Sequence, residues 1–446
     1  MKKRNVVLIS LDEVRPDHLS CYGYRKIKTH NIDKVAEGGV LFETCIAAGC
    51  FTPICMSSVI CGVYPNKHML RDPFARIQYQ TIAKILKEYN YQTAGFVGVG
   101  VLGVRHGFGA GFDSFDEPSQ DTIWRQWDFK DPSKELFYEG NWWVDRMLEW
   151  LRENHSSTFF LWGHYYETHE GAEKALLRDK LIKEGELSEF AYKDAKIKYC
   201  DEKLFGRLLE AFEELELWEN TTLIILGDHG TNLGEHPAKP IPHHPDGLIY
   251  PQHMTLYDVN VKVPLIIRDK DLPQGRKVRE VVRSVDVVPT ILDLLKIPAK
   301  KMDFDGASLL PLIAKREPEG RTAYAECLYD FGNRRDGELQ AFRTDKFKFM
   351  RDLTKGTEEF YYLQDDPLEE NNLMERVRES KRPELENIRR KLNSLFFKTK
   401  GTDIAFSNKE KEEIRNRLRS LGYMEWQIVS YLHLEKTQIT YDFISS

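Results

Sequence analysis

Two short acidic motifs each follow directly on a run of apolar, largely β-branched residues. Asp12 and Glu13 come after NVVLISL at residues 5–11, and Asp228 and His229 come after TTLIILG at residues 221–227. Ligands of open parallel sheets bind beyond the carboxyl ends of the strands, so these side chains are expected to meet at one edge. Carboxylates and imidazoles gathered from separate strands can hold a divalent metal ion. The sequence therefore predicts a metal site.

The stretch GCFTPICMSSVICGVYP, residues 49–65, offers several possible nucleophiles. Pro53 suits the first position of a helix and Thr52 is a good N-cap before it. The helix would end at Gly62. Thr52 would then lie at the helix N-terminus, where the dipole and the free N–H groups favour an anion. Cysteines 45, 50 and 61 have no nearby base in the sequence, and buried thiols are usually inert.

These residues must be positioned by alternating strands and helices, the pattern of a mainly parallel sheet with helices on both faces. We predict strands at 5–11, 158–166, 221–227 and 263–269, with helices at 81–90, 190–215 and 285–295. After about residue 318, shorter half-polar strands at hairpin spacing precede a helix, PELENIRRKLNSLFF. We therefore predict a catalytic α/β domain at 1–318, a small subdomain with an antiparallel sheet and a helix at 319–400, and a helical tail at 401–446.

Composition narrows the class of protein. The chain has 446 residues and a formal net charge of −6, which gives no reason to expect nucleic-acid binding. Seven cysteines without a framework spacing favour a reduced, cytoplasmic protein. No apolar run approaches the ~20 residues of a membrane span. The oligomeric state is left open.

The chain resembles the sulfatase branch of the alkaline phosphatase superfamily from about residue 5 to 423. NVVLISLDEVRPDHLSCYGY resembles the family's opening strand and first metal-ligand motif, and GDHGTNLGEH resembles the second. HNIDKVAEGGVLFETCIAAG resembles the segment before the nucleophile, and VPLIIR, VDVVPTILDLL and FYYLQDDPLEENNL follow in the family's order. The resemblance implies a sulfatase-like α/β fold with a C-terminal antiparallel sheet.

The chain departs from the family at the position of the nucleophile. Sulfatases carry Cys-x-Pro-x-Arg, whose cysteine is oxidised to formylglycine and stands ten residues before the Gly of Gly-x-Tyr-Pro. Here that position is Thr52, the proline is shifted to Pro53, and Met56 replaces the arginine. The lysine of the sulfate-binding motif after YQTA is missing, and His253 replaces the lysine before the LYD motif.

Threonine at this position is typical of the superfamily's phosphodiesterases, phosphonate monoester hydrolases and phosphotransferases. The resemblance implies that Thr52 is the nucleophile, next to a cation held by Asp12, Asp228 and His229; Glu13 is a further possible ligand and the Thr52 oxygen would contact the ion. His169 and His253 are candidates for binding ester oxygens or protonating the leaving group. One ion, of Mn, Zn, Ca or Mg, is favoured over two, because the Asp-x-x-x-His of two-zinc relatives is absent.

The leading hypothesis is a metal-dependent hydrolase of phosphate or phosphonate esters, with diesters favoured, acting on a small molecule. The alternatives are a sulfatase that acts without formylglycine, a phosphotransferase and a catalytically inactive binding module. Tryptophans 124, 127, 142 and 143 are candidates for pocket walls, although a place in the core is the simpler expectation.

Overall fold

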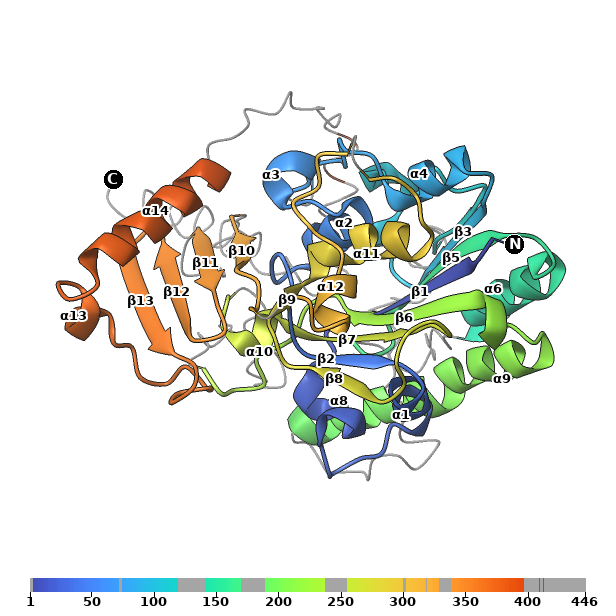
Figure 1. The fold of residues 1–446 in the computed structure, drawn as a ribbon, viewed down its shortest axis with the longest axis horizontal. Coiled ribbons are helices and arrows are strands. Elements are labelled where there is room, and N and C mark those ends of the chain that lie inside the picture. The colour runs from blue at the N-terminus through green and yellow to red at the C-terminus, as the bar shows by residue number, and fades with distance from the viewer. Residues whose placement is uncertain are drawn as a thin grey trace, which may run out of the picture.

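The computed structural model describes residues 3–71, 74–118, 141–169, 189–236, 255–299, 302–317, 319–328 and 338–396, together with residues 409 and 412. In these residues the structure is an α/β fold with a large, mostly parallel sheet and a separate antiparallel sheet (Figure 1). Both sheets agree with the sequence prediction.

The large sheet has nine strands within the described residues. In spatial order the strands are β4 (Ser114–Asp116), β3 (Gln92–Val97), β5 (Phe159–Tyr165), β1 (Asn5–Leu11), β6 (Thr221–Gly227), β7 (Lys262–Arg268), β2 (Val40–Ile46) and β8 (Arg276–Val278), with β9 (Val282–Arg283) also paired to β2. The central strand β1 is completely buried, as an unbroken apolar run covered on both faces should be. The strands β3, β4, β5, β1 and β6 run parallel, whereas β7 is antiparallel to both β6 and β2.

The register of the three central strands fixes where their motifs end. Leu11, the last residue of β1, is paired with Tyr165 of β5 on one side and with Gly227 of β6 on the other. The residues that follow these three strands therefore emerge side by side at one edge. Asp12 and Asp228 are the first residues beyond β1 and β6, so the predicted convergence of the two acidic motifs is confirmed.

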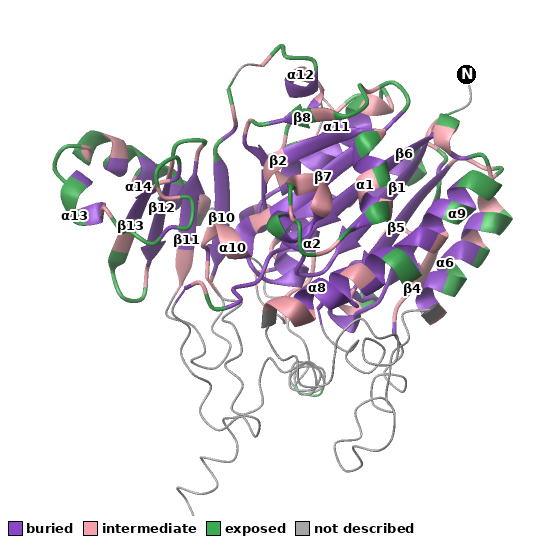
Figure 2. Cartoon of the chain, turned by 90° about the horizontal axis from the view of Figure 1, so that it is seen from below, coloured by how far each residue is buried: buried purple, intermediate pink, exposed green. Residues whose placement is uncertain are grey.

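Helices cover both faces of this sheet, and their inward sides are buried while their outward sides are exposed (Figures 1 and 2). The predicted long helix 190–215 is present, but a π-helical stretch interrupts it between α8 and α9. One face carries α2 (Thr52–Cys61), α4 (Ile82–Glu88) and α11 (Val287–Leu294). The other carries α1 (His30–Glu37), α6 (Asn141–Asn154), α8 (Glu189–Tyr199), the π-helix η5 (Cys200–Phe205) and α9 (Gly206–Glu214).

Helix α2 begins one residue earlier than its sequence predicts. Phe51 is the N-cap, and Thr52 is the first helical residue, so the expectation that Thr52 caps the helix is wrong. Its hydroxyl makes no capping bond and contacts a residue of another segment instead. The predicted end is confirmed, since Gly62 has a φ of 66°, a left-handed conformation that glycine adopts without strain.

The smaller sheet lies at one end of the molecule and is backed by the helix α14 (Figure 1). Its four strands are antiparallel and follow each other in chain order: β10 (Ala323–Cys327), β11 (Leu339–Arg343), β12 (Phe347–Asp352) and β13 (Thr357–Tyr362), followed by α13 (Met374–Val377) and α14 (Arg382–Phe396). The Glu326 N–H donates to the Ala48 carbonyl at 3.0 Å, so β10 holds the segment that leads into α2. The domain boundary at residue 318 and the helical tail stay predictions.

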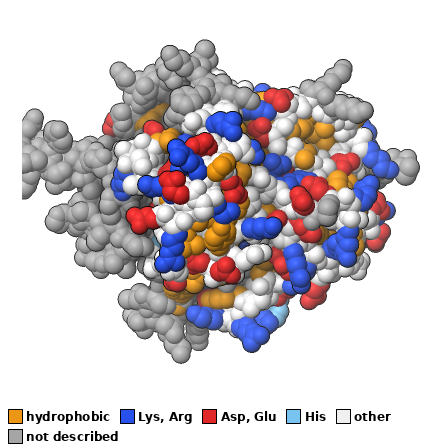
Figure 3. All heavy atoms as spheres, turned by 60° about the vertical axis from the view of Figure 1, so that its left-hand side comes forward, with side chains coloured by type: hydrophobic (Ala, Val, Ile, Leu, Met, Phe, Trp, Pro, Cys, Tyr) orange, Lys and Arg blue, Asp and Glu red, His pale blue; other side chains and the backbone are white. Residues whose placement is uncertain are grey.

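The remaining elements are short. They are η1 (Pro16–His18), η2 (Ser20–Tyr22), α3 (Pro65–His68), η3 (Gly100–Leu102), η4 (Val104–His106), η6 (Trp218–Asn220), α10 (Asp258–Val261), η7 (Ser284–Asp286) and α12 (Leu310–Ile313). On the face that carries the smaller sheet, basic and acidic side chains are intermixed (Figure 3). None of the helices in the described ranges has the length and apolar character needed to cross a bilayer.

Candidate active site

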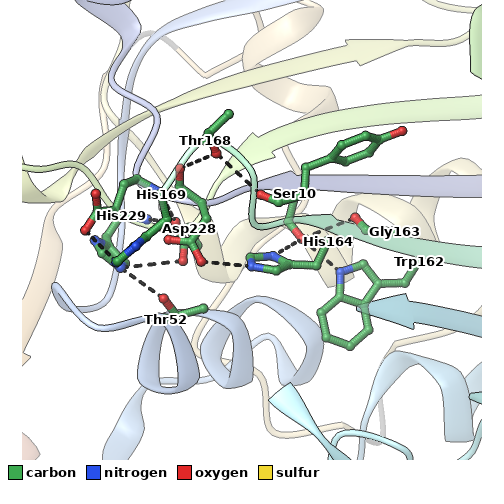
Figure 4. A network of polar contacts seen from close by, with 12 residues as sticks. Ser10, Thr52, Trp162, Gly163, His164, Thr168, His169, Asp228 and His229 are labelled. Carbon is green, nitrogen blue, oxygen red and sulfur yellow. Dashed lines mark hydrogen bonds and ion pairs between the residues drawn. The ribbon is translucent and has the colours of Figure 1, made fainter. Parts of the chain in front are cut away.

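Side chains from four separate segments meet beyond the carboxyl ends of β1 and β6 (Figure 4). Asp12 and Asp228 are both completely buried, and His229 and Thr52 are each 1 % exposed. The Thr52 hydroxyl points from the start of α2 toward the His229 ring, and its Oγ1 lies 3.1 Å from His229 Nε2. A hydroxyl, an imidazole and two carboxylates thus share one buried space.

The turn after β1 is held in an unusual conformation. Glu13 has a φ of 54°, in the left-handed region that non-glycine residues rarely adopt. Its N–H donates to Asp228 Oδ1 at 2.9 Å, and the Asp12 carbonyl accepts from Thr168 Oγ1 at 2.6 Å. These bonds join the ends of β1, β6 and the segment after β5. Strain of this kind persists where the surroundings over-determine it, which is common at functional sites.

The contacts of His229 indicate which ring nitrogen carries the proton. Its Nδ1 lies 2.8 Å from the Gly230 carbonyl, which can only accept a hydrogen bond, so Nδ1 is the protonated nitrogen. In the neutral ring the Nε2 lone pair then faces Thr52 and the carboxylates. Gly230 itself cannot carry a side chain, because a Cβ there would lie 2.1 Å from the Val259 carbonyl oxygen.

The donor set fits a divalent cation. Ligand atoms of Asp12, Glu13 and His229 lie within 4.8 Å of one another, as do those of a second group, Asp12, His164 and Asp228. Asp12 Oδ1 and Asp228 Oδ2 are buried without a hydrogen-bond partner among the described residues. Burial, reinforced by the neighbouring Asp228 carboxylate, raises the pKa of Asp12 well above its ordinary value. Buried carboxylates that repel one another in this way are characteristic of metal sites.

Glu13 has two basic neighbours. Its Oε1 lies 3.1 Å from His169 Nε2, and its Oε2 accepts from Lys193 Nζ at 3.1 Å. Lys193 comes from α8 and also donates to the Thr168 carbonyl at 2.8 Å. Burial lowers the pKa of Lys193, and the Glu13 carboxylate opposes that shift. The structure thus brings His169 to the site, as the sequence predicts.

A chain of buried hydrogen bonds supports Asp12 from inside the sheet. Trp162 Nε1 donates to Ser10 Oγ at 3.0 Å, and Ser10 Oγ lies 2.8 Å from His164 Nδ1. Burial lowers the pKa of His164 to about 4, so the ring is neutral at physiological pH. An ionised Asp12 carboxylate can only accept, so His164 Nε2–H donates to Asp12 Oδ2 at 3.1 Å, and the unprotonated Nδ1 accepts from Ser10 Oγ.

Breaking this chain should loosen metal binding without removing a carboxylate. Outer-shell partners of metal ligands typically contribute 10- to 100-fold in affinity. We expect His164→Ala to weaken Mn²⁺ binding by about 10-fold or more, and Ser10→Ala, which frees the ring to take the other tautomer, by about 3- to 10-fold. Isothermal titration calorimetry measures both. Unchanged Mn²⁺ affinity in both variants would show that these hydrogen bonds do not support the metal site.

Sequence reasoning missed Lys193 as a site residue. The sequence carries no signal for it, since only the structure shows that Lys193 and Lys196, three residues apart on α8, are both buried. The sequence places His164 near the end of the strand predicted at 158–166 but does not indicate a role for it. His253 lies outside the described residues, as do Trp124 and Trp127.

Several other side chains have structural surroundings. Trp143 is buried in the core, where its Nε1 donates to Glu167 Oε1 at 2.8 Å. The thiol of Cys55 is completely buried, and burial together with the nearby Asp228 raises its pKa well above the ordinary value. A thiol in this state is a poor nucleophile. His236, in the second acidic motif, stacks on Tyr257 with the two ring centres 3.7 Å apart.

The comparisons with known proteins agree with this architecture. The model of the sulfatase family matches residues 4–297. The chain belongs to the sulfatase family. A second model, the C-terminal region of N-sulphoglucosamine sulphohydrolase, matches residues 250–398, which include the smaller sheet. An arylsulfatase of Clostridium perfringens is 24% identical over 461 residues, covering 83% of this chain and 90% of the relative. An ulvan-active sulfatase of Formosa agariphila is also 24% identical, covering 94% and 83%.

Solved structures with the same fold include sulfatases and a phosphonate monoester hydrolase. A protein solved in complex with its substrate D-glucosamine-2-N,6-O-disulfate superposes with a TM-score of 0.69 at 19% identity, covering 91% of this chain and all of that one. The phosphonate monoester hydrolase of Agrobacterium radiobacter gives 0.67 at 21% identity, covering 88% and 95%. This sulfatase-family chain is accordingly a hydrolase of the alkaline phosphatase-like superfamily. Enzymes of the family use divalent metal ions, and the site described above has groups that could hold one.

Proposed function

We propose that this protein hydrolyses phosphate or phosphonate esters, diesters above all, through the hydroxyl of Thr52. The observation that carries the proposal is the position of Thr52 Oγ1, buried at the start of α2 and 3.1 Å from His229 Nε2, beside Asp12 and Asp228. The formylglycine that sulfatases use cannot form from a threonine. A threonine nucleophile, as in the phosphodiesterases and phosphonate monoester hydrolases of the superfamily, favours a phosphate or phosphonate ester over a sulfate ester.

The residues Asp12, Asp228 and His229 would hold the cation, with Glu13 as a further possible ligand. When bound, such a cation lowers the pKa of an adjacent hydroxyl and offsets negative charge on the ester oxygens. The Thr52 oxygen would attack phosphorus in line while the bond to the departing alcohol or phenol breaks, and water would then hydrolyse the phosphothreonine to release the second product and restore Thr52. The hydrogen bond from His229 Nδ1 to the Gly230 carbonyl holds the ring orientation while this happens.

The leaving group needs a proton donor, and His169 is our candidate. It is 4 % exposed, its ring stacks on Tyr166 at 5.0 Å, and Glu13 Oε1 lies 3.1 Å from its Nε2. Histidine is the side chain that most often transfers a proton to a departing oxygen. His253 stays a second candidate from the sequence.

A sulfuric ester is the second candidate substrate, because the relatives that match most of the chain are named sulfatases. The same cation and the same Thr52 hydroxyl would serve an attack on sulfur. What argues against it is the lack, in this sequence, of the arginine and of the lysines that sulfatases place around the sulfate.

The test is a hydrolysis panel on the purified protein. Aryl phosphate diesters and monoesters, an aryl phosphonate and an aryl sulfate are each assayed with Mn²⁺, Zn²⁺, Ca²⁺ and Mg²⁺. We expect the highest kcat/KM on a diester or a phosphonate, and loss of turnover after chelation that returns when metal is added. Turnover of the sulfate alone would reject phosphoryl transfer in favour of the second candidate.

A further inference from the structure

We propose that Lys193 is the counter-cation of Glu13, and that this pair sets the charge of the active centre so that it selects singly charged esters over doubly charged ones. The inference rests on the proposed function for its substrate but not for the pairing itself. Lys193 is a specificity-determining residue supplied by α8, an element that carries none of the other candidate site residues.

The centre holds more carboxylates than one divalent cation neutralises. Asp12 and Asp228 are completely buried and Glu13 is 4 % exposed. A buried carboxylate without a compensating charge is strongly destabilising, so the third one requires a further cation.

Lys193 is placed to supply that charge. It is 5 % exposed, and its Nζ donates to Glu13 Oε2 at 3.1 Å and to the Thr168 carbonyl at 2.8 Å. It therefore joins the turn after β1 to the segment after β5, next to His169. Three residues along α8, Lys196 donates to the His169 carbonyl at 2.6 Å, so the helix fixes both backbone carbonyls.

The formal charge that results is small. Three carboxylates, one ammonium and one divalent cation have formal charges that sum to zero. Of the other buried charged residues near by in the described ranges, Lys196 and Glu167 have opposite signs, and Arg15 pairs with Asp17 and Glu235. Diesters, phosphonate monoesters and sulfate monoesters carry one negative charge, whereas phosphate monoesters carry two near neutral pH. A centre without excess positive charge gains little from the second charge.

A double-mutant cycle that removes each of the two charges tests the pairing. The variants are Lys193→Met, Glu13→Gln and the double variant, with Lys193→Arg to keep the charge. Lys198→Met is the control, because Lys198 lies on the same helix but is 38% exposed in its side chain and pairs only loosely with Glu202, at 3.8 Å. Circular dichroism and thermal melts of each variant confirm that it is folded.

The first readout is Mn²⁺ affinity by isothermal titration calorimetry, which requires no substrate. We expect Lys193→Met to tighten binding at least threefold and Glu13→Gln to weaken it at least tenfold. Lys193→Met should tighten binding by a larger factor in the Glu13→Gln background, where the ammonium has lost its partner, than in the wild type, so the double variant should return close to wild type. Effects that simply multiply, with no coupling between the two positions, would overturn the pairing.

The second readout is the ratio of kcat/KM for an aryl phosphate monoester to that for the matching diester. Glu13→Gln should raise this ratio about tenfold and Lys193→Met should lower it. The double variant should return the ratio to near the wild-type value, and Lys193→Arg should leave it unchanged. A ratio that none of the variants moves would overturn the claim about charge selection. If the wild type hydrolyses only the aryl sulfate, the proposed phosphoryl reaction fails, yet a singly charged substrate still agrees with this inference.

Discussion

Replacing Thr52 by alanine is expected to lower kcat on the best ester of the panel by about 10⁴-fold or more, the scale seen when an enzyme loses its nucleophile. The reason is that the described residues place no other hydroxyl against His229, since Thr52 Oγ1 makes that contact at 3.1 Å. Thr52→Ser keeps a hydroxyl at the start of α2 and should keep a measurable part of the rate. Steady-state kinetics with saturating Mn²⁺ gives both values.

Two matched controls share helix α2 with Thr52. Ser57→Ala removes a hydroxyl that donates to the Pro53 carbonyl at 2.6 Å, and Cys55→Ala removes the buried thiol one turn from Thr52. Both variants should stay within about threefold of wild type, the scale of change that leaves the reacting atoms untouched. If Cys55→Ala lost activity while Thr52→Ala retained it, the nucleophile would be the thiol.

The second large effect is expected at the buried carboxylates. Asp12→Asn and Asp228→Asn should each weaken Mn²⁺ binding by at least about 100-fold, above the range of outer-shell partners, and should remove most of the metal-dependent turnover. Each substitution removes a charged oxygen that is buried without a partner among the described residues. Calorimetry and a metal titration of the rate measure the two losses.

In the metal-free protein, Asp12→Asn should raise the thermal stability of the fold. Burial raises the folded-state pKa of Asp12 above the unfolded value, so its ionised form destabilises the fold. That penalty is fully present above the folded pKa and disappears below the unfolded value of 3.8. At neutral pH, chelator-treated Asp12→Asn should therefore melt at a higher temperature than chelator-treated wild type. Asp303→Asn, whose side chain is 85% exposed, is the control and should show no such gain.

Much of the fold followed from the sequence because its signals are local. The unbroken apolar runs of β1 and β6 predicted buried parallel strands, and Gly62 marked the end of α2. The acidic motifs could be placed together because parallel strands that neighbour each other end at the same edge. The misplaced start of α2 shows the limit of local reasoning. A threonine before a proline is a good cap, yet Thr52 turns its hydroxyl to His229, a contact that only the folded chain provides.

The sequence did not predict the contacts around these residues either, because they too form only in the folded chain. Lys193 stands 180 residues from Glu13, in a helix whose charged residues suggest an exposed surface. The role of His164 depends on the register that pairs it with Ser10 across β1 and β5. No spacing rule reports either contact, because each is fixed by how helices and strands pack rather than by the order of residues.

Peptide mapping by mass spectrometry can show whether the Thr52 hydroxyl attacks the ester. The wild-type enzyme is mixed with an aryl phosphate diester and Mn²⁺, quenched with acid during the first turnover, and digested. We expect a phosphoryl adduct on Thr52 that is absent in Thr52→Ala. An adduct on another side chain, or a formylglycine at Cys50 or Cys55, would contradict it.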